Sequence, residues 1–350
     1  MREYVEFRIP EEYASCFLEP HIGKGLGEKM LPPTVRAVEV AVDDPLYRRI
    51  GEIDRDHRAQ GKGPFFFGWE IKRRYLRQEL ETAEIFHLFF TAIFEPAGEE
   101  CGTVYDESTA CPICGAGRTQ VSDLILDLRK VPKGKDLACT IADDEWIVSQ
   151  RLAELLLDGG MTGFELRPVR HKARYEDEPV DLTKVPSGRE LLRQAEEAGL
   201  RDGTWDFYVW LNRPEQRELA ERARQEHAEL LERRAGRRAK PLPVWYQLIV
   251  TSTPVPTVPP TRFGIDPFDE DPEGQCRCPL GHVSGLNLLS EVWIPRAAWD
   301  GSDIVRSQNM VGARGGLLVP RPLLFISPRL WRLLEREKVR GYQVEVAHLV

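Results

Sequence analysis

The residues most suited to chemistry form a short cysteine motif near the middle of the chain, Cys111-Pro-Ile-Cys114-Gly115. Two residues between the thiols allow both sulfurs to bind one metal ion, and the glycine permits the tight turn that this geometry requires. The motif supplies two ligands, whereas a structural zinc site needs four. Cys101, a short way upstream, is a third candidate ligand.

A related motif stands in the C-terminal half, Cys276-Arg-Cys278-Pro-Leu-Gly-His282, and Gly281 occupies the position that matches the second cysteine of the first motif. If the two motifs face each other, Cys278 with His282, or Cys276, completes a site for one zinc ion. The alternative is a degenerate turn that keeps its shape without metal and leaves its thiols free. A redox role for the first motif is less favoured, because no thioredoxin-like βαβ pattern surrounds it.

The composition places these motifs in a reducing compartment. Seven cysteines in 350 residues are too few for a disulfide scaffold, and their number is odd. No stretch approaches the roughly 18 apolar residues that span a membrane. The acidic start of the sequence lacks the apolar core of a signal peptide. We therefore expect a cytoplasmic protein without a membrane partner, in which grouped cysteines bind metal.

The net charge of the protein indicates which class of partner it can bind. The formal net charge is −8, which disfavours a nucleic-acid partner because such binding needs a basic footprint. Hydrophobic residues make up 42% and charged residues 30%, which allows a globular core of ordinary size. An acidic protein suits a protein partner with a basic cleft, through electrostatic steering and complementarity.

Hydrophobic periodicity predicts the elements that position the motifs. Alternation over 35–42 indicates a half-buried strand, and a helix at 72–81 with a strand at 84–95 is expected next. After the first motif, Ser149 is a predicted N-cap for a helix over 150–158. Further strands are expected at 124–128, before this helix, and at 163–169, after it. Another is expected at 244–251, after the central charged region.

The two halves of the chain repeat each other. Residues 147–156 align with 325–334 without a gap, and the same spacing carries Gly163 onto Gly341. Upstream, the Cys-Pro pair at Cys111 matches the one at Cys278, and a Gly-x-Asp-apolar segment follows both. The spacing changes once, which places an insertion in the second copy near residues 310–322. The shared order indicates an internal duplication.

These signals predict an α+β fold in which each copy is a Cys-Pro knuckle followed by a strand–helix–strand unit. The two copies are expected to share a mixed sheet, or else to pack around a pseudo-two-fold axis, with a common core. The expected divisions are an N-terminal α+β region, a first repeat, a helical insertion and a second repeat: 1–100, 101–170, 171–243 and 244–350. In the insertion, the aromatic group from Trp205 to Trp210 is expected to tether it to the body or to contact a partner.

No catalytic signature accompanies the cysteine motifs. The sequence has no phosphate-cradling glycine loop, no Gly-x-Ser-x-Gly and no His-Glu-x-x-His. We therefore assign no catalytic residue and favour a protein that is not an enzyme.

The segment from Cys111 to Val169 resembles the double-CXXCG motif immunity proteins of bacterial polymorphic and contact-dependent toxin systems. The resemblance is carried by the Cys-Pro-x-Cys-Gly turn, a Leu-Ile-Leu-Asp strand, the Ile-Val-Ser-x-Arg-Leu start of a helix and a closing Gly-Phe-Glu-Leu-x-Pro-Val strand. A degenerate copy extends over 278–350. The chain departs from the family in lacking the second Cys-x-x-Cys, and residues 1–95 have no counterpart there.

What the resemblance implies is a non-enzymatic, protein-binding immunity protein that occludes and neutralises a bacterial toxin. Two other classes stay open. One is a zinc-ribbon structural or scaffold component of a larger assembly. The other is an enzyme of unknown activity that uses the groove between the repeats. The nature of the binding partner separates the first two classes, and activity of the purified protein separates both from the third.

Overall fold

A computed structural model describes one compact unit formed by Met1–His171 with Val244–Val350. The described residues are 1–26, 34–142, 145–172, 225, 242–270, 278–280, 282–284, 286–312 and 320–350. The helices expected within 171–243, the aromatic group from Trp205 to Trp210 and the candidate ligand Cys276 therefore lie outside them. The described part is α+β, as the sequence predicts, with helices beside several mixed sheets.

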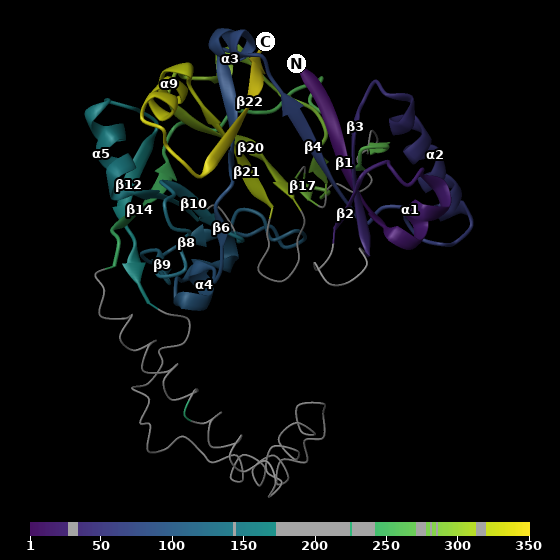
Figure 1. Cartoon of the computed structure of the whole chain (residues 1–350). Helices are drawn as coiled ribbons and strands as arrows, with labels where there is room; N and C mark the ends of the chain where they lie inside the picture. The colour runs from purple at the N-terminus through teal and green to yellow at the C-terminus, as the bar shows by residue number, and fades with distance from the viewer. Residues whose placement is uncertain are drawn as a thin grey trace, which may run out of the picture. The chain divides into compact units, whose positions relative to one another are not determined.

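The N-terminal region is a four-stranded antiparallel sheet in the order β2-β3-β1-β4, with two helices beside it (Figure 1). Its elements are β1 (Arg2–Pro10), α1 (Glu11–Phe17), β2 (Lys24–Leu26), β3 (Val35–Ala41), α2 (Pro45–Ala59) and β4 (Gly68–Arg74). The strand expected at 35–42 is thus confirmed as β3. Asp44 caps α2 by accepting a hydrogen bond from the backbone N–H of Leu46 at 2.8 Å.

The helix expected at 72–81 is wrong in its first part. Residues up to Arg74 continue β4, because Lys72 and Arg73 form ion pairs with Glu6 and Glu3 on the neighbouring β1. Only α3 (Arg77–Thr82) is helical. The strand expected at 84–95 is two strands, β5 (Ile85–Phe90) and β6 (Ile93–Phe94), which belong to different sheets.

The two repeats do not share one sheet, so that expectation is wrong. The first lies in a five-stranded sheet, β12-β14-β11-β10-β6, and the second in a six-stranded sheet, β17-β20-β21-β5-β22-β19. The five-stranded sheet contains β10 (Leu137–Thr140), β11 (Trp146–Ser149), β12 (Phe164–Pro168) and β14 (Trp245–Val250), and α5 (Gln150–Asp158) follows β11. The six-stranded sheet contains β17 (Val283–Ser284), β19 (Val292–Ile294), β20 (Ile304–Gly312), β21 (Arg321–Ile326) and β22 (Tyr342–Leu349), and α9 (Pro328–Arg336) follows β21.

The repeats exchange one strand. β5 precedes the first repeat in the chain, yet it pairs with β21 and β22 of the second, where its blue ribbon runs among the yellow-green strands (Figure 1). β14 precedes the second repeat and pairs with β11 and β12 of the first. The order β12-β14-β11-β10 therefore matches β22-β5-β21-β20. Each repeat thus begins with a strand that completes the other sheet, and the division at residue 100 separates β5 from the repeat it opens.

The polar contacts around the two helices are reciprocal. Ser149 and Ser327 cap α5 and α9, and each serine hydroxyl donates to an aspartate of its own repeat, Asp136 at 3.0 Å and Asp303 at 2.6 Å. Both aspartates also reach the other repeat. The backbone N–H of Arg340 donates to Asp136 at 3.2 Å, and that of Thr162 donates to Asp303 at 3.0 Å.

One hydrophobic core joins the repeats. Leucines of α5 and α9 pack with strand residues of both sheets in a single buried cluster, which includes Leu137, Val148, Leu152, Leu156, Leu248, Ile304, Leu324, Leu330 and Leu334. A strand–helix–strand unit alone has a marginal core, so the shared interior stabilises both copies together. The expected common core is therefore present although the common sheet is not.

Short elements connect these layers. They are α4 (Gly98–Cys101), β7 (Tyr105–Asp106), η1 (Glu107–Thr109), β8 (Thr119–Gln120), β9 (Ile125–Leu126), β13 (Arg170–His171), β15 (Phe263–Asp266), β16 (Asp269–Glu270), β18 (Asn287–Leu288) and η4 (Arg296–Ala298). None of the helices in the described ranges has the length and apolar character needed to cross a membrane.

The exchanged strands predict that a cut between the repeats will not separate them. A specific protease site inserted within 172–185 should yield two fragments that elute together on size-exclusion chromatography. They should part only in denaturant, because each fragment holds a strand of the other's sheet. The uncut protein is the reference. Elution of two separate folded halves would contradict the exchange.

A second prediction concerns acid stability. Burial alone would raise the pKa of Asp136, but hydrogen bonds from Arg151, from the Arg340 backbone and from Ser149 hold it below its ordinary value of 3.8. The aspartate therefore stabilises the folded state above that value, and this contribution is lost as the pH falls through the lower folded pKa. Asp136→Asn should cost about 1–3 kcal/mol at pH 7, and this cost should shrink below pH 3.8. Urea unfolding at several pH values measures both, and a cost independent of pH would refute the assignment.

Candidate metal centre

The two cysteine motifs meet in the folded chain. Cys111 and Cys114 lie between η1 and β8, in a turn closed by two backbone bonds, from the Gly115 N–H to the Cys111 carbonyl and from the Cys111 N–H to the Ala116 carbonyl, both 2.8 Å. Gly115 has a φ of +75°, a conformation that favours glycine. The short sequence motif therefore folds as the tight turn that its spacing predicts.

The second motif forms the facing half. The backbone N–H of Cys278 donates to the carbonyl of His282 at 2.9 Å. Cys111, Cys114, Cys278 and His282 each offer one ligand atom, and these four atoms all lie within 4.8 Å of one another. The three cysteines are buried and the histidine is half-buried. The cluster could thus hold a metal ion.

Two of the distances in the cluster are close to those expected around one tetrahedral ion. The sulfurs of Cys111 and Cys278 are 3.6 Å apart, and Cys114 Sγ is 3.2 Å from His282 Nδ1. Zinc–sulfur bonds of about 2.3 Å in a tetrahedron separate two sulfurs by about 3.8 Å. The Cys111–Cys278 separation is much too long for a disulfide, whose sulfurs lie about 2.05 Å apart, and both cysteines are free.

The electrostatics favour a thiolate in this cluster. A backbone hydrogen bond from Cys114 is the main cause that lowers the pKa of Cys111 to about 6. Burial raises the pKa of Cys114 to about 11, and the neighbouring thiols act in the same direction. Several thiolates side by side repel each other, and a divalent cation removes this repulsion. Metal binding would therefore release protons from the remaining thiols.

Cys101 lies elsewhere. It ends α4, is buried, and is not among the four grouped ligands. Burial raises the pKa of its thiol, and the nearby carboxylates of Asp127 and Glu145 also raise it. The cluster has four ligands without it, so the structure brings together Cys111, Cys114, Cys278 and His282 from the expected set and leaves Cys101 in the core.

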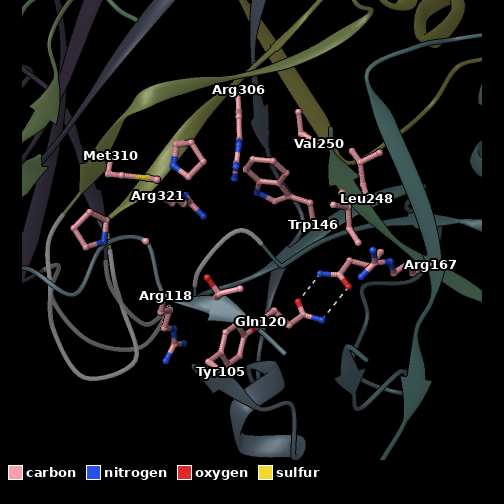
Figure 2. A pocket seen from close by; sticks show the side chains of 16 residues that line it. Tyr105, Arg118, Gln120, Trp146, Arg167, Leu248, Val250, Arg306, Met310 and Arg321 are labelled. Atoms are coloured by element: carbon pink, nitrogen blue, oxygen red, sulfur yellow. Dashed lines mark hydrogen bonds between the residues drawn. The ribbon is translucent and has the colours of Figure 1, made fainter. Parts of the chain in front are cut away.

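A second constellation, not predicted from the sequence, lies next to the knuckle. Arg118, Arg306 and Arg321 line a cavity between the sheets of the two repeats (Figure 2). Met310 lines the same cavity and packs against the cysteine cluster. These residues show no regular spacing in the sequence. Arg306 and Met310 lie on β20 and Arg321 lies on β21, and the pairing of these two strands brings them together. No sequence pattern signals such a site.

Comparison of this chain with protein-family models, with curated proteins and with solved structures finds no match. The function of the chain must therefore be inferred from the geometry of the site and from the resemblance of the segment from Cys111 to Val169.

Proposed function

We propose that the four-residue cluster binds one zinc ion and that this ion has a structural role. The proposal is supported by the ligand set, because three thiolates and one imidazole within tetrahedral reach are a set that zinc prefers. Four protein ligands leave no open position for water or substrate, which is the mark of a structural rather than a catalytic zinc. The zinc would join the two repeats, since each contributes two ligands.

We propose further that the chain is a non-enzymatic protein-binding module of immunity type, which neutralises a bacterial toxin in the cytoplasm. The observation that carries this proposal is the cluster of four ligands, which with zinc bound would stiffen the contact between the repeats and leave no open metal position. The resemblance to double-CXXCG motif immunity proteins supplies the class of partner. The net charge of −8 suits a toxin with a basic active-site cleft.

Capture from the native host tests this function when it is coupled to a growth assay. The protein bound to the tagged chain is identified by mass spectrometry and then expressed alone in a test host. The proposal expects growth arrest, and recovery when this chain is co-expressed. An unrelated protein of similar net charge serves as the control for co-expression.

The other classes give different results in the same experiment. A captured partner that is harmless alone and that forms a stable assembly with this chain would replace the immunity role by a zinc-ribbon scaffold role. Turnover of a substrate by the purified chain, lost in a cavity variant, would replace both by an enzyme.

A further inference from the structure

The cavity beside the knuckle is large enough for a small ligand. Its volume is about 330 Å³, within the range of small-molecule sites. The sheet of the first repeat, the β7–β8 hairpin and the β20–β21 pair line it. Figure 2 shows Arg306 and Arg321 on one side of this space and Gln120 on the other. The cavity thus lies between the repeats rather than on one of them.

The lining of this cavity is cationic in an acidic protein. Among the described residues that line it, four are arginines and none is an aspartate or glutamate. Two of the arginines are matched by carboxylates outside the cavity. Arg118 pairs with Glu99 at 2.9 Å, and Arg167 pairs with Glu165 at 2.8 Å. The cation of interest for ligand binding is therefore Arg321, on β21.

Arg321 is the central cation of the cavity. It is half-buried and its side chain forms a hydrogen bond with the Cys139 thiol, but within the described ranges it forms no ion pair with a carboxylate. Its charge acts on the neighbouring His87. Burial is the main cause that lowers the pKa of His87 to about 3, and the charges of Arg73 and Arg321 lower it further, so the buried imidazole is neutral. A half-buried guanidinium without a counter-ion is costly unless an anion is supplied.

Neutral hydrogen-bonding groups and aromatic rings complete the lining. The side-chain amides of Gln120 and Gln247 bond to each other in both directions, at 3.2 and 2.7 Å, and hold this wall in one orientation. Tyr105 and Trp146 add ring surface. A cationic end, fixed amides and aromatic walls are typical of a site for a small organic anion.

We propose that this cavity binds a small oxyanion ligand, bearing a phosphate or carboxylate group that pairs with Arg321. Arg306 projects into the same space from the neighbouring strand, on the same side of the cavity as Arg321 (Figure 2). The guanidinium of arginine matches phosphate and carboxylate geometry with two parallel hydrogen bonds. This site is independent of the proposed zinc and of the proposed toxin partner.

Titration of the full-length protein with sodium phosphate and, separately, with sodium succinate tests the proposal. Sodium chloride keeps the ionic strength constant, and calorimetry with the thermal midpoint of unfolding gives the affinity. Saturable binding of phosphate would identify a phosphate-bearing ligand, and binding of succinate alone would identify a carboxylate. Absence of saturable binding for both would overturn the proposal.

Charge-removal variants locate the site. Arg321→Gln should weaken binding about tenfold or more, because charged hydrogen bonds are lost. Arg332→Gln removes the same charge from an exposed position on α9 and should bind like the wild type. If Arg321→Gln does not fold by near-ultraviolet circular dichroism, Arg306→Gln takes its place. Equal loss in the control and the cavity variant would overturn the proposal.

Discussion

A Cys111→Ser variant is expected to lose its metal and much of its stability. Cys111 lies opposite Cys278, and their sulfurs are 3.6 Å apart, so serine removes the ligand that joins the two knuckles. Zinc binding adds to folding stability through linkage, by about 4 kcal/mol when free zinc is a thousand times the Kd. The zinc content should fall from about one equivalent to less than a tenth, and the melting temperature in added zinc should fall with it.

Cys16→Ser is the matched control for this experiment. Cys16 is a free, exposed cysteine of α1 and is not one of the four grouped ligands. Its replacement should leave the metal content and the melting temperature unchanged. If Cys111→Ser kept a full equivalent of zinc, or melted like the control in the presence of zinc, the cluster would not be the metal site.

The second large effect is expected at Gly163, where the chain turns from α5 into β12. Its φ is +89°, and a Cβ here would overlap the backbone carbonyl oxygen of Ile304 in the other repeat. The backbone N–H of Ile304 donates to the adjacent Thr162 carbonyl at 3.1 Å, so this backbone cannot move away freely. Gly163→Ala should therefore destabilise the protein by about 3–5 kcal/mol in urea unfolding.

Gly301 separates the two causes of this effect. Its φ is +85°, nearly that of Gly163, but a Cβ there meets no atom within 4 Å. Gly301→Ala should thus cost only the left-handed backbone strain, about 1–2 kcal/mol. Equal costs at the two glycines would show that Gly163 is not in close contact with the backbone of Ile304, contrary to the structure.

Local signals in the sequence predicted local structure well. The helix expected at 150–158 is α5 with the same bounds, and Ser149 caps it. The matching serine in the second copy, Ser327, caps α9 in the same way. Capping and the helical period depend on residues a few positions apart, which is why a single sequence reveals them.

The strand exchange could not be predicted in the same way. β5 and β14 are apolar strands of ordinary pattern, and nothing local tells which sheet each one joins. The sequence does contain one weak signal that β5 and β14 are equivalent strands. The pair Leu88 and Thr91 is repeated, with the same separation, as Leu248 and Thr251. The N–H of each threonine donates to the glycine that opens the last strand of the other repeat, at 2.9 Å, as Thr91 to Gly341 and Thr251 to Gly163.

The two motifs of the cysteine–histidine cluster could be recognised in the sequence. The spacing of Cys111 and Cys114 and the loss of the paired cysteine beside His282 are visible in the sequence. The sequence did not show which further residues complete the cluster, because Cys101 is chemically as suitable a ligand as Cys278 or His282. Only the position of α4 in the core separates Cys101 from the cluster. The cationic cavity has no sequence motif, because strands distant in the chain assemble it.

X-ray absorption at the zinc edge, on protein purified without chelator and with its metal content measured, identifies the ligands of the proposed structural zinc. We expect about one equivalent of zinc, bound by three sulfurs at about 2.3 Å and one nitrogen at about 2.0–2.1 Å, with no oxygen ligand. In Cys114→Ser and in His282→Ala this first shell should be lost or should gain oxygen. Less than about a tenth of an equivalent, or a wild-type shell with an exchangeable oxygen ligand, would contradict a structural zinc that joins the two repeats.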